Sequence, residues 1–244
     1  MESWRQALWL VKFELRAYRK NMFFAMLPSL LLYFAIVYTL ESDKVNDGSI
    51  SMLDDILFVT IFWFAVVWMK PKEFQYQKLA GKFWASPYFV MLKQLPIPKD
   101  ILIKSRFLQY YVTSIPVHLL VLMMIFISSP TIRDLLSPGE YIAFSLIWLS
   151  SGMVMGGVFP ASESGEYNSK LKLVIYTIIS IVVFLGGFIA LYIFTGEGLV
   201  YWSIVAANKW PILSASFSIC IAVAFMIYWP HYMRKNIERI DYFK

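Results

Sequence analysis

The chain has 244 residues, of which 59% are hydrophobic and 16% are charged, whereas about a quarter are charged in ordinary soluble domains. A water-soluble fold of this size could not cover so much apolar surface, so the composition excludes that class. The single cysteine, Cys220, excludes a disulfide framework and a cysteine-based metal site. The net charge of +6 is explained better by the charge bias of membrane proteins and by anionic lipid headgroups than by nucleic acid.

Long apolar runs without any charged side chain predict six transmembrane helices, at Met22–Leu40, Ile56–Met69, Phe107–Ile127, Tyr141–Phe159, Leu173–Phe194 and Trp210–Trp229. Nineteen of the 22 lysines and arginines lie in residues 1–21, 70–106, 160–172 and 230–244, and three lie in 41–55, 128–140 and 195–209. Loops rich in these residues stay on the cytoplasmic side. We therefore expect an all-α polytopic protein of the cell (plasma) membrane, with one transmembrane domain over residues 1–244 and both termini in the cytoplasm.

Residues 1–21 form an amphipathic helical pattern. Its cations fall in one narrow stripe, and an apolar ridge that begins at Trp4 runs beside them. This pattern is typical of a helix that lies in the membrane interface with its cations toward the headgroups. The alternative is a plain cytoplasmic cap on the first span. The residues that define the predicted interfacial helix are Trp4, Arg5, Lys12, Arg16 and Arg19.

The outer segment 41–55 is short and acidic, and the second span begins close behind it. Cut at Asp55, this span has a length of about 21 Å, which is less than the roughly 30 Å of a bilayer core. We expect it to begin near Ile50, with Asp54 and Asp55 facing protein or water. These two carboxylates are then either pathway residues or boundary charges at a thinned bilayer edge.

Residues 70–106 form the longest segment predicted to lie in the cytoplasm. Ser86 and Pro87 predict a helix start, with serine as N-cap and proline at the first position. Pro96 ends this helix, and Pro98 opens the next one, which continues into the third span. A short apolar helix in this place needs a surface to cover it. That surface is either a partner protein or the bilayer itself.

Small residues predict close helix packing in the fourth and fifth spans, at Gly152, Gly156, Gly157, Gly186 and Gly187. Residues 195–209, between the last two spans, are apolar but too short to cross the membrane. We expect them to form an extracellular or re-entrant segment.

Catalytic chemistry is missing from the sequence. His118 is the one titratable candidate for an ion pathway inside the spans, and a packing role is the more common fate of such a histidine. No protease signature and no phosphate-binding loop is present. We therefore expect no enzyme activity, no cofactor and no metal site on this chain.

The stretch from Leu92 to Arg106 is similar to one that enters the third span in permease subunits of bacterial type-2 ABC exporters. It reads Leu-Lys-Gln-Leu-Pro-Ile-Pro-Lys-Asp-Ile-Leu-Ile-Lys-Ser-Arg. The chain also resembles this family in its basic interfacial helix, its six spans, its long loop between spans two and three, and its segment between spans five and six. Its lysine-rich stretch Lys70–Lys82 and its short second span depart from the family pattern.

The resemblance implies that the helix at 87–95 is the coupling helix, which sits in a cleft of a separate ATPase subunit that binds ATP and magnesium. The N-terminal helix would be the elbow helix, and two permeases would pair, as a homodimer or with a related paralogue. The expected function is ATP-driven export of a hydrophobic or amphipathic peptide, toxin or lipid. The alternatives are a membrane anchor that transports nothing, and an ion-coupled carrier. The predicted ATPase contacts are Pro87, Tyr88, Phe89, Val90, Met91, Leu92, Lys93, Gln94, Leu95 and Pro96.

Overall fold

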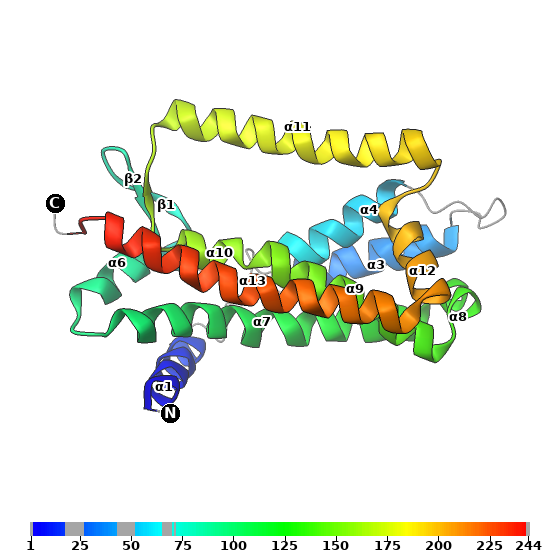
Figure 1. Cartoon of the computed structure of the whole chain (residues 1–244), viewed down its shortest axis with the longest axis horizontal. Coiled ribbons are helices and arrows are strands. Elements are labelled where there is room, and N and C mark those ends of the chain that lie inside the picture. The colour runs from blue at the N-terminus through cyan, green and yellow to red at the C-terminus, as the bar shows by residue number, and fades with distance from the viewer. Residues whose placement is uncertain (1, 18–26, 43–51, 65–69, 71, 243–244) are drawn as a thin grey trace.

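The computed structural model describes residues 2–17, 27–42, 52–64, 70 and 72–242. It is an all-α structure with one small sheet (Figure 1). In chain order the elements are α1 (Glu2–Ala17), α3 (Leu27–Ser42), α4 (Met52–Val59), the π-helix η2 (Thr60–Phe64), the 3-10 helix η3 (Lys72–Phe74), β1 (Gln77–Ala80), β2 (Phe83–Ala85), α6 (Pro87–Gln94), α7 (Lys99–Ser128), α8 (Pro130–Leu135), α9 (Pro138–Gly156), α10 (Val158–Ser162), β3 (Glu166–Tyr167), α11 (Lys170–Thr195), α12 (Leu199–Lys209) and α13 (Pro211–Arg239).

Four helical segments are long and apolar enough to cross a membrane. They are Lys99–Ser128, Pro138–Ser162, Lys170–Thr195 and Pro211–Arg239, which coincide with the last four predicted spans. The first two predicted spans are only partly described, as α3 and as α4 with η2, because residues 22–26 and 65–69 lie outside the described residues. The structure therefore supports a multi-pass membrane protein, and the count of six spans stays a prediction.

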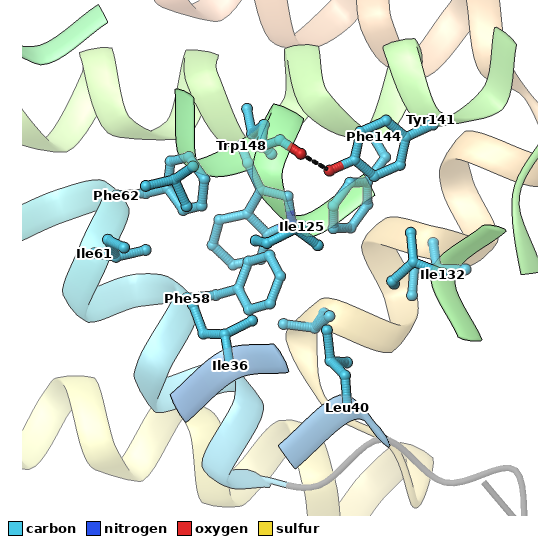
Figure 2. Close-up of a cluster of buried hydrophobic side chains, with 14 of the residues drawn as sticks. Ile36, Leu40, Phe58, Ile61, Phe62, Ile125, Ile132, Tyr141, Phe144 and Trp148 are labelled. Atoms are coloured by element: carbon cyan, nitrogen blue, oxygen red, sulfur yellow. Dashed lines mark hydrogen bonds between the residues drawn. The ribbon is translucent and has the colours of Figure 1, made fainter. Parts of the chain in front are cut away.

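The main core lies where α3, α4, η2, α7, α9 and α12 meet. Aromatic side chains dominate it: the rings of Phe58 and Trp148 are 4.9 Å apart, and those of Phe58 and Phe144 are 5.9 Å apart. Figure 2 shows these rings facing one another between the helices. The polar edge of Trp148 is satisfied, since its Nε1 donates to Ser203 Oγ of α12 at 3.0 Å. The indole thus fastens α12 against the core.

The glycines of α9 permit close approach of neighbouring helices. A Cβ at Gly152 would lie 2.8 Å from the Phe62 carbonyl oxygen, and one at Gly156 would overlap the ring of Tyr110. Gly157 is in similarly tight contact with Trp229 of α13. Gly186 and Gly187 of α11 differ, because nothing lies within 4 Å of an added Cβ at either of them. Close packing of these two against another chain stays a prediction.

Asp54 and Asp55 hold helices together at the end of the bundle where α12 lies. The Asp54 carboxylate accepts the Thr39 hydroxyl of α3 at 2.5 Å. The Asp55 carboxylate accepts the backbone N–H groups of Leu199 at 2.8 Å and Val200 at 2.7 Å, and so caps the first turn of α12. Both side chains are buried. Of the two roles considered from the sequence, neither is needed to explain these carboxylates, because each one has a structural partner.

His118 of α7 lies in a packed position. Its side chain is buried, and its ring lies 5.1 Å from that of Phe62. A Cβ at Gly152 would lie 3.1 Å from its Cε1 atom. The imidazole therefore fills the space between α7, η2 and α9 and is in contact with an aromatic ring on one side.

Both ends of the described chain lie at the same end of the bundle, which we call the terminal end (Figure 1). Helices α1 and α6 and the small sheet lie there too, whereas α8 and α12 lie at the opposite end (Figure 1). The cation-rich segments therefore gather at one end, as their alternation along the sequence predicts. Which end faces the cytoplasm stays a prediction.

The sheet at the terminal end is not predicted from the sequence. Strand β1 pairs antiparallel with β2, and β2 pairs antiparallel with β3. Gly81, with φ of +50°, forms the turn between the first two strands. These strands have four, three and two residues, which is too short for an alternating apolar pattern to stand out.

The glycines offer a matched test of packing. Gly156→Ala would force the Tyr110 ring away from the Gly152 carbonyl oxygen, to which its hydroxyl donates at 2.8 Å, and we expect a loss of about 1–3 kcal/mol. Gly186→Ala meets open space and removes a helix-weakening glycine, so its effect is a gain of up to about 1 kcal/mol. Unfolding in mixed micelles measures both, and equal effects would contradict the packing described.

Candidate functional site

Helix α6 begins as the sequence predicts. The Ser86 side chain accepts the Phe89 backbone N–H at 3.4 Å, and Pro87 occupies the first helical position, where its missing N–H costs nothing. The helix ends at Gln94, before Leu95 and Pro96, because the residue before proline avoids the α conformation. It is thus a short rod at the terminal end, connected by a tight turn to α7.

The apolar face of α6 is covered by this chain's own helices. Phe89 has no exposed surface and Leu92 is 3% exposed, and both pack in a second core with side chains of α1, α7, α10 and α13. This corrects the expectation that a partner protein or the bilayer covers Phe89 and Leu92, because α1, α7, α10 and α13 enclose them. Met91 and Leu95, each 48% exposed, together with Gln94 and Pro96, form the free surface of the helix.

The remaining predicted contacts of α6 are half-buried, and Tyr88 and Lys93 are the most informative of them. The hydroxyl of Tyr88 donates to the Glu14 carboxylate of α1 at 2.9 Å. Partial burial, with Lys99 nearby, lowers the pKa of the Lys93 ammonium group. Pro87 and Val90 complete this half-buried set.

Helix α1 lies across α7 near the terminal end (Figure 1). Its inner face is Ala7, Leu10, Val11 and Glu14. The outer face exposes apolar side chains on both sides of its cations, namely Trp4, Leu8, Trp9, Phe13, Arg5, Lys12 and Arg16. That composition suits a membrane interface. Of the cations predicted for this helix, Arg19 lies outside the described residues.

One lysine and one arginine of α7 attach α1 to this helix. Lys104 donates to Ser3 Oγ at 2.8 Å, and its Nζ lies 5.0 Å above the ring of Trp4. Two residues further along, the guanidinium group of Arg106 binds the Glu14 carboxylate. The two contacts fix both the position of α1 along α7 and its rotation.

Arg106 lies at the centre of a buried ionic cluster, which consists of Glu14, Lys70, Arg106 and Glu163. The Arg106 side chain has no exposed surface, and those of Glu14 and Glu163 are 1% and 3% exposed. Its Nη1 lies 3.8 Å from Glu163 Oε2, and Glu163 also binds Lys70. Two cations and two carboxylates therefore balance inside a region from which water is excluded.

The cluster connects segments that are distant in the sequence. Glu14 comes from α1, Arg106 from α7 directly before the third predicted span, and Glu163 from the residue after α10. Tyr88 links it to α6 by its hydrogen bond to Glu14, and the Arg106 guanidinium lies 5.3 Å from the centre of the Tyr88 ring. Burial raises the pKa of the Glu14 carboxyl, and the adjacent Arg106 guanidinium opposes that shift by favouring the ionised form.

Sequence reasoning missed this cluster. One signal was available: Glu14 falls on the same helical face as Ala7, Leu10 and Val11, where a carboxylate needs a cationic partner. Which of the chain's cations supplies it follows only from the fold. Arg106 and Lys70 stood out as members of a basic loop, and Glu163 had no signal in the sequence.

Comparison with known proteins adds nothing to these observations. No protein family, no curated protein and no solved structure matches the chain. The functional reading therefore depends on the residues and their geometry.

The buried pair is open to a direct test. Glu14→Ala leaves Arg106 buried without its nearest carboxylate, and we expect a loss of about 3–5 kcal/mol of unfolding free energy. The matched control is Asp100→Ala, which removes the exposed Asp100–Arg234 pair at 2.8 Å and should cost at most about 1 kcal/mol. Denaturant titration in mixed micelles, followed by tryptophan fluorescence, compares the two.

A double variant separates the cost of an unpaired charge from the worth of the pair. Glu14→Leu with Arg106→Met replaces the ions by apolar side chains of similar size, and it should recover most of the stability lost in Glu14→Ala. If the double variant were no more stable than Glu14→Ala, the loss in Glu14→Ala could not be due to the unpaired charge of Arg106.

Proposed function

We propose that this chain is the permease subunit of a type-2 ABC exporter in the cell membrane, with both termini in the cytoplasm and with ATP and magnesium bound by a separate ATPase subunit. The cargo is a hydrophobic or amphipathic molecule. The proposal is supported by the resemblance of Leu92–Arg106 to that family and by the multi-pass character of the helices. The single observation that carries it is a short, proline-bounded helix, α6, seated on a rigid platform at the same end as both termini.

The ATPase would contact the outer surface of α6. Met91 and Leu95 are the exposed apolar side chains there, and Gln94 and Pro96 flank them. Exposed apolar groups on a helix whose other face is fully packed are suited to insertion into the groove of a partner. Lys93 adds a cation at the rim of this surface.

A push on α6 would reach the membrane helices by two routes. The first is covalent, through the turn at Pro96 and Pro98 into α7, which has 30 residues and a length of about 45 Å. The second passes from Tyr88 to Glu14 and Arg106, which connects α6 with α1 and α7. Because the second core also encloses Phe89, the helix moves together with α7 and α13 instead of bending away from them.

A second permease would pair with this one through the membrane. Of the four long apolar helices, the two with the lowest burial are candidates for that contact: in α11 and in α13, 6% of the most apolar window is buried. Apolar helix faces inside a bilayer associate through packing and not through the hydrophobic effect, so small residues favour such contacts. Gly186 of α11 supplies one, since nothing in the described chain lies within 4 Å of an added Cβ there.

The proposed docking surface predicts a clear contrast between two faces of one helix. Met91→Asp or Leu95→Asp places a charge on the exposed face, so each should abolish co-purification of an ATPase with the tagged full chain from its native membranes while leaving its folding unchanged. Phe89→Asp buries a charge in the second core and should instead lower the stability of the chain by several kcal/mol.

Leu135→Asp is the control, because Leu135 is a similarly exposed leucine, 41% exposed, at the opposite end of the bundle. It should retain the ATPase at the yield of the unmodified chain. Wild-type yield of an ATPase with both Met91→Asp and Leu95→Asp would overturn the assignment of this face.

A further inference from the structure

Helix α11 is the outermost helix of the bundle (Figure 1). Of its 26 residues only Phe188 is buried. The helix nevertheless has specific contacts on one side: the rings of Phe184 and of Trp63 in η2 are 5.4 Å apart, and Phe188 packs in the main core. It is thus attached to η2 along part of its length and separated from the bundle elsewhere.

An open groove of about 500 Å³, which we call the cavity, lies between α11 and the bundle. Its walls come from η2, α9, α11 and the start of α12, and its lining residues are Trp63, Met155, Ser180, Val183, Phe184, Gly187, Phe188, Leu191 and Leu199. None of them carries a charge. The one indole N–H among them is satisfied elsewhere, since Trp63 Nε1 donates to Ser151 Oγ at 2.7 Å. Apart from the Ser180 hydroxyl the walls are apolar, so they suit an apolar chain.

Cations gather at the terminal end of the same helix. Lys170 and Lys172 form its first turn, and both are exposed. Lys82 is next to them, because its carbonyl oxygen accepts the Asn168 backbone N–H at 2.8 Å. Glu166 of β3 accepts a hydrogen bond from the Asn168 side chain at 2.5 Å, and Asp241 is near the same strand, because its backbone oxygen accepts the Tyr167 hydroxyl at 3.1 Å. Three cations against these two carboxylates leave a positive surface where α11 begins.

The spacing between cavity and cations fits one molecule. Twelve residues separate Lys172 from Phe184, which corresponds to about 18 Å along a helix. One leaflet of a bilayer core measures about 15 Å. A chain whose charged group lies at the lysines therefore reaches Phe184 and Gly187 when it extends about 3–8 Å past the middle of the bilayer core.

We propose that the groove between α11 and η2 binds an amphiphile with an apolar chain and an anionic group, a phosphate or a carboxylate. The chain occupies the cavity beside Gly187, and Lys82, Lys170 and Lys172 bind the anionic group. Recognition by charge at one end and by apolar contact at the other selects anionic amphiphiles over uncharged ones. This inference rests on the proposed function in naming that molecule the cargo, but the binding itself does not require an ATPase.

The two adjacent glycines of α11 provide a matched pair of variants. Gly187 lines the cavity, Gly186 does not, and an added Cβ meets nothing within 4 Å at either position. Gly187→Leu therefore fills the cavity, and Gly186→Leu places the same side chain outside it. Each buried methylene is worth roughly a fourfold gain in affinity, so displacing two of them should weaken binding by about tenfold.

The experiment uses the full chain alone in phosphatidylcholine vesicles, with a long-chain fatty acid that carries a photoreactive diazirine in its tail. The fatty alcohol with the same tail is the uncharged comparison. We expect the acid to crosslink to the 173–191 segment and Trp63 in the unmodified chain and in Gly186→Leu, and about tenfold less in Gly187→Leu. Replacing Lys82, Lys170 and Lys172 together by Gln should reduce labelling by the acid to the level of the alcohol.

Equal labelling of Gly187→Leu and Gly186→Leu would overturn the cavity as the site. Equal labelling by acid and alcohol in the unmodified chain would overturn the anionic group. Absence of labelling in the 173–191 segment of the unmodified chain would overturn the groove as a binding site for the probe. Each result is independent of ATPase co-purification, so the failure of this inference and the failure of the proposed function are distinguishable.

Discussion

One constraint organises the terminal end of this protein: a guanidinium group enclosed by apolar helices must have carboxylates in contact with it. An isolated buried charge costs far more than a single packing contact returns. Arg106 meets the requirement with Glu14 and Glu163, and Glu163 in turn neutralises Lys70. The partners come from three separate segments, so the position of each segment depends on the others. Helix α6 belongs to the same arrangement through Tyr88, because its hydroxyl donates to Glu14.

This dependence changes how the short helix α6 is to be understood. The sequence shows a proline-bounded apolar helix, and apolarity alone suggests a surface that awaits a partner. In the fold, the strongly apolar residues Phe89 and Leu92 are covered by the chain's own second core. What remains for a partner is the narrower surface of Met91 and Leu95. A helix that is anchored on its inner face and exposed on its outer face can transmit a displacement, whereas a free apolar peg would rotate or detach under the same force.

Much of the fold could be predicted from the sequence, and the reason is physical. A run of about twenty residues without charge predicts a helix long enough to cross a membrane. Ser86 followed by Pro87 predicts a helix start, because serine accepts a backbone N–H there and proline needs none. The site could be predicted only in part. The ion pairs join residues 92 positions apart, as for Glu14 and Arg106, and no local pattern records such a pairing. The sheet could not be predicted, because its strands are too short for an alternation of apolar and polar residues to be recognised. The carboxylates Asp54 and Asp55 looked exceptional in the sequence, but in the fold they bond to groups of neighbouring helices.

The helices differ in how much of their surface is packed against the rest of the chain. A helix with little packed surface can move at the lowest cost in free energy. Helices α7 and α9 bury large side chains such as Tyr110 and Trp148, and their glycine contacts leave no space for adjustment. Helix α11 buries only Phe188 and lies beside a cavity. Elements that move during function are drawn from the least stable part of a structure, because they must change position without unfolding the rest. The ionic cluster and the second core hold α1, α6, α7 and α13 together at the terminal end. Helix α11, with one buried side chain, is therefore the helix that can shift with the least loss of packing.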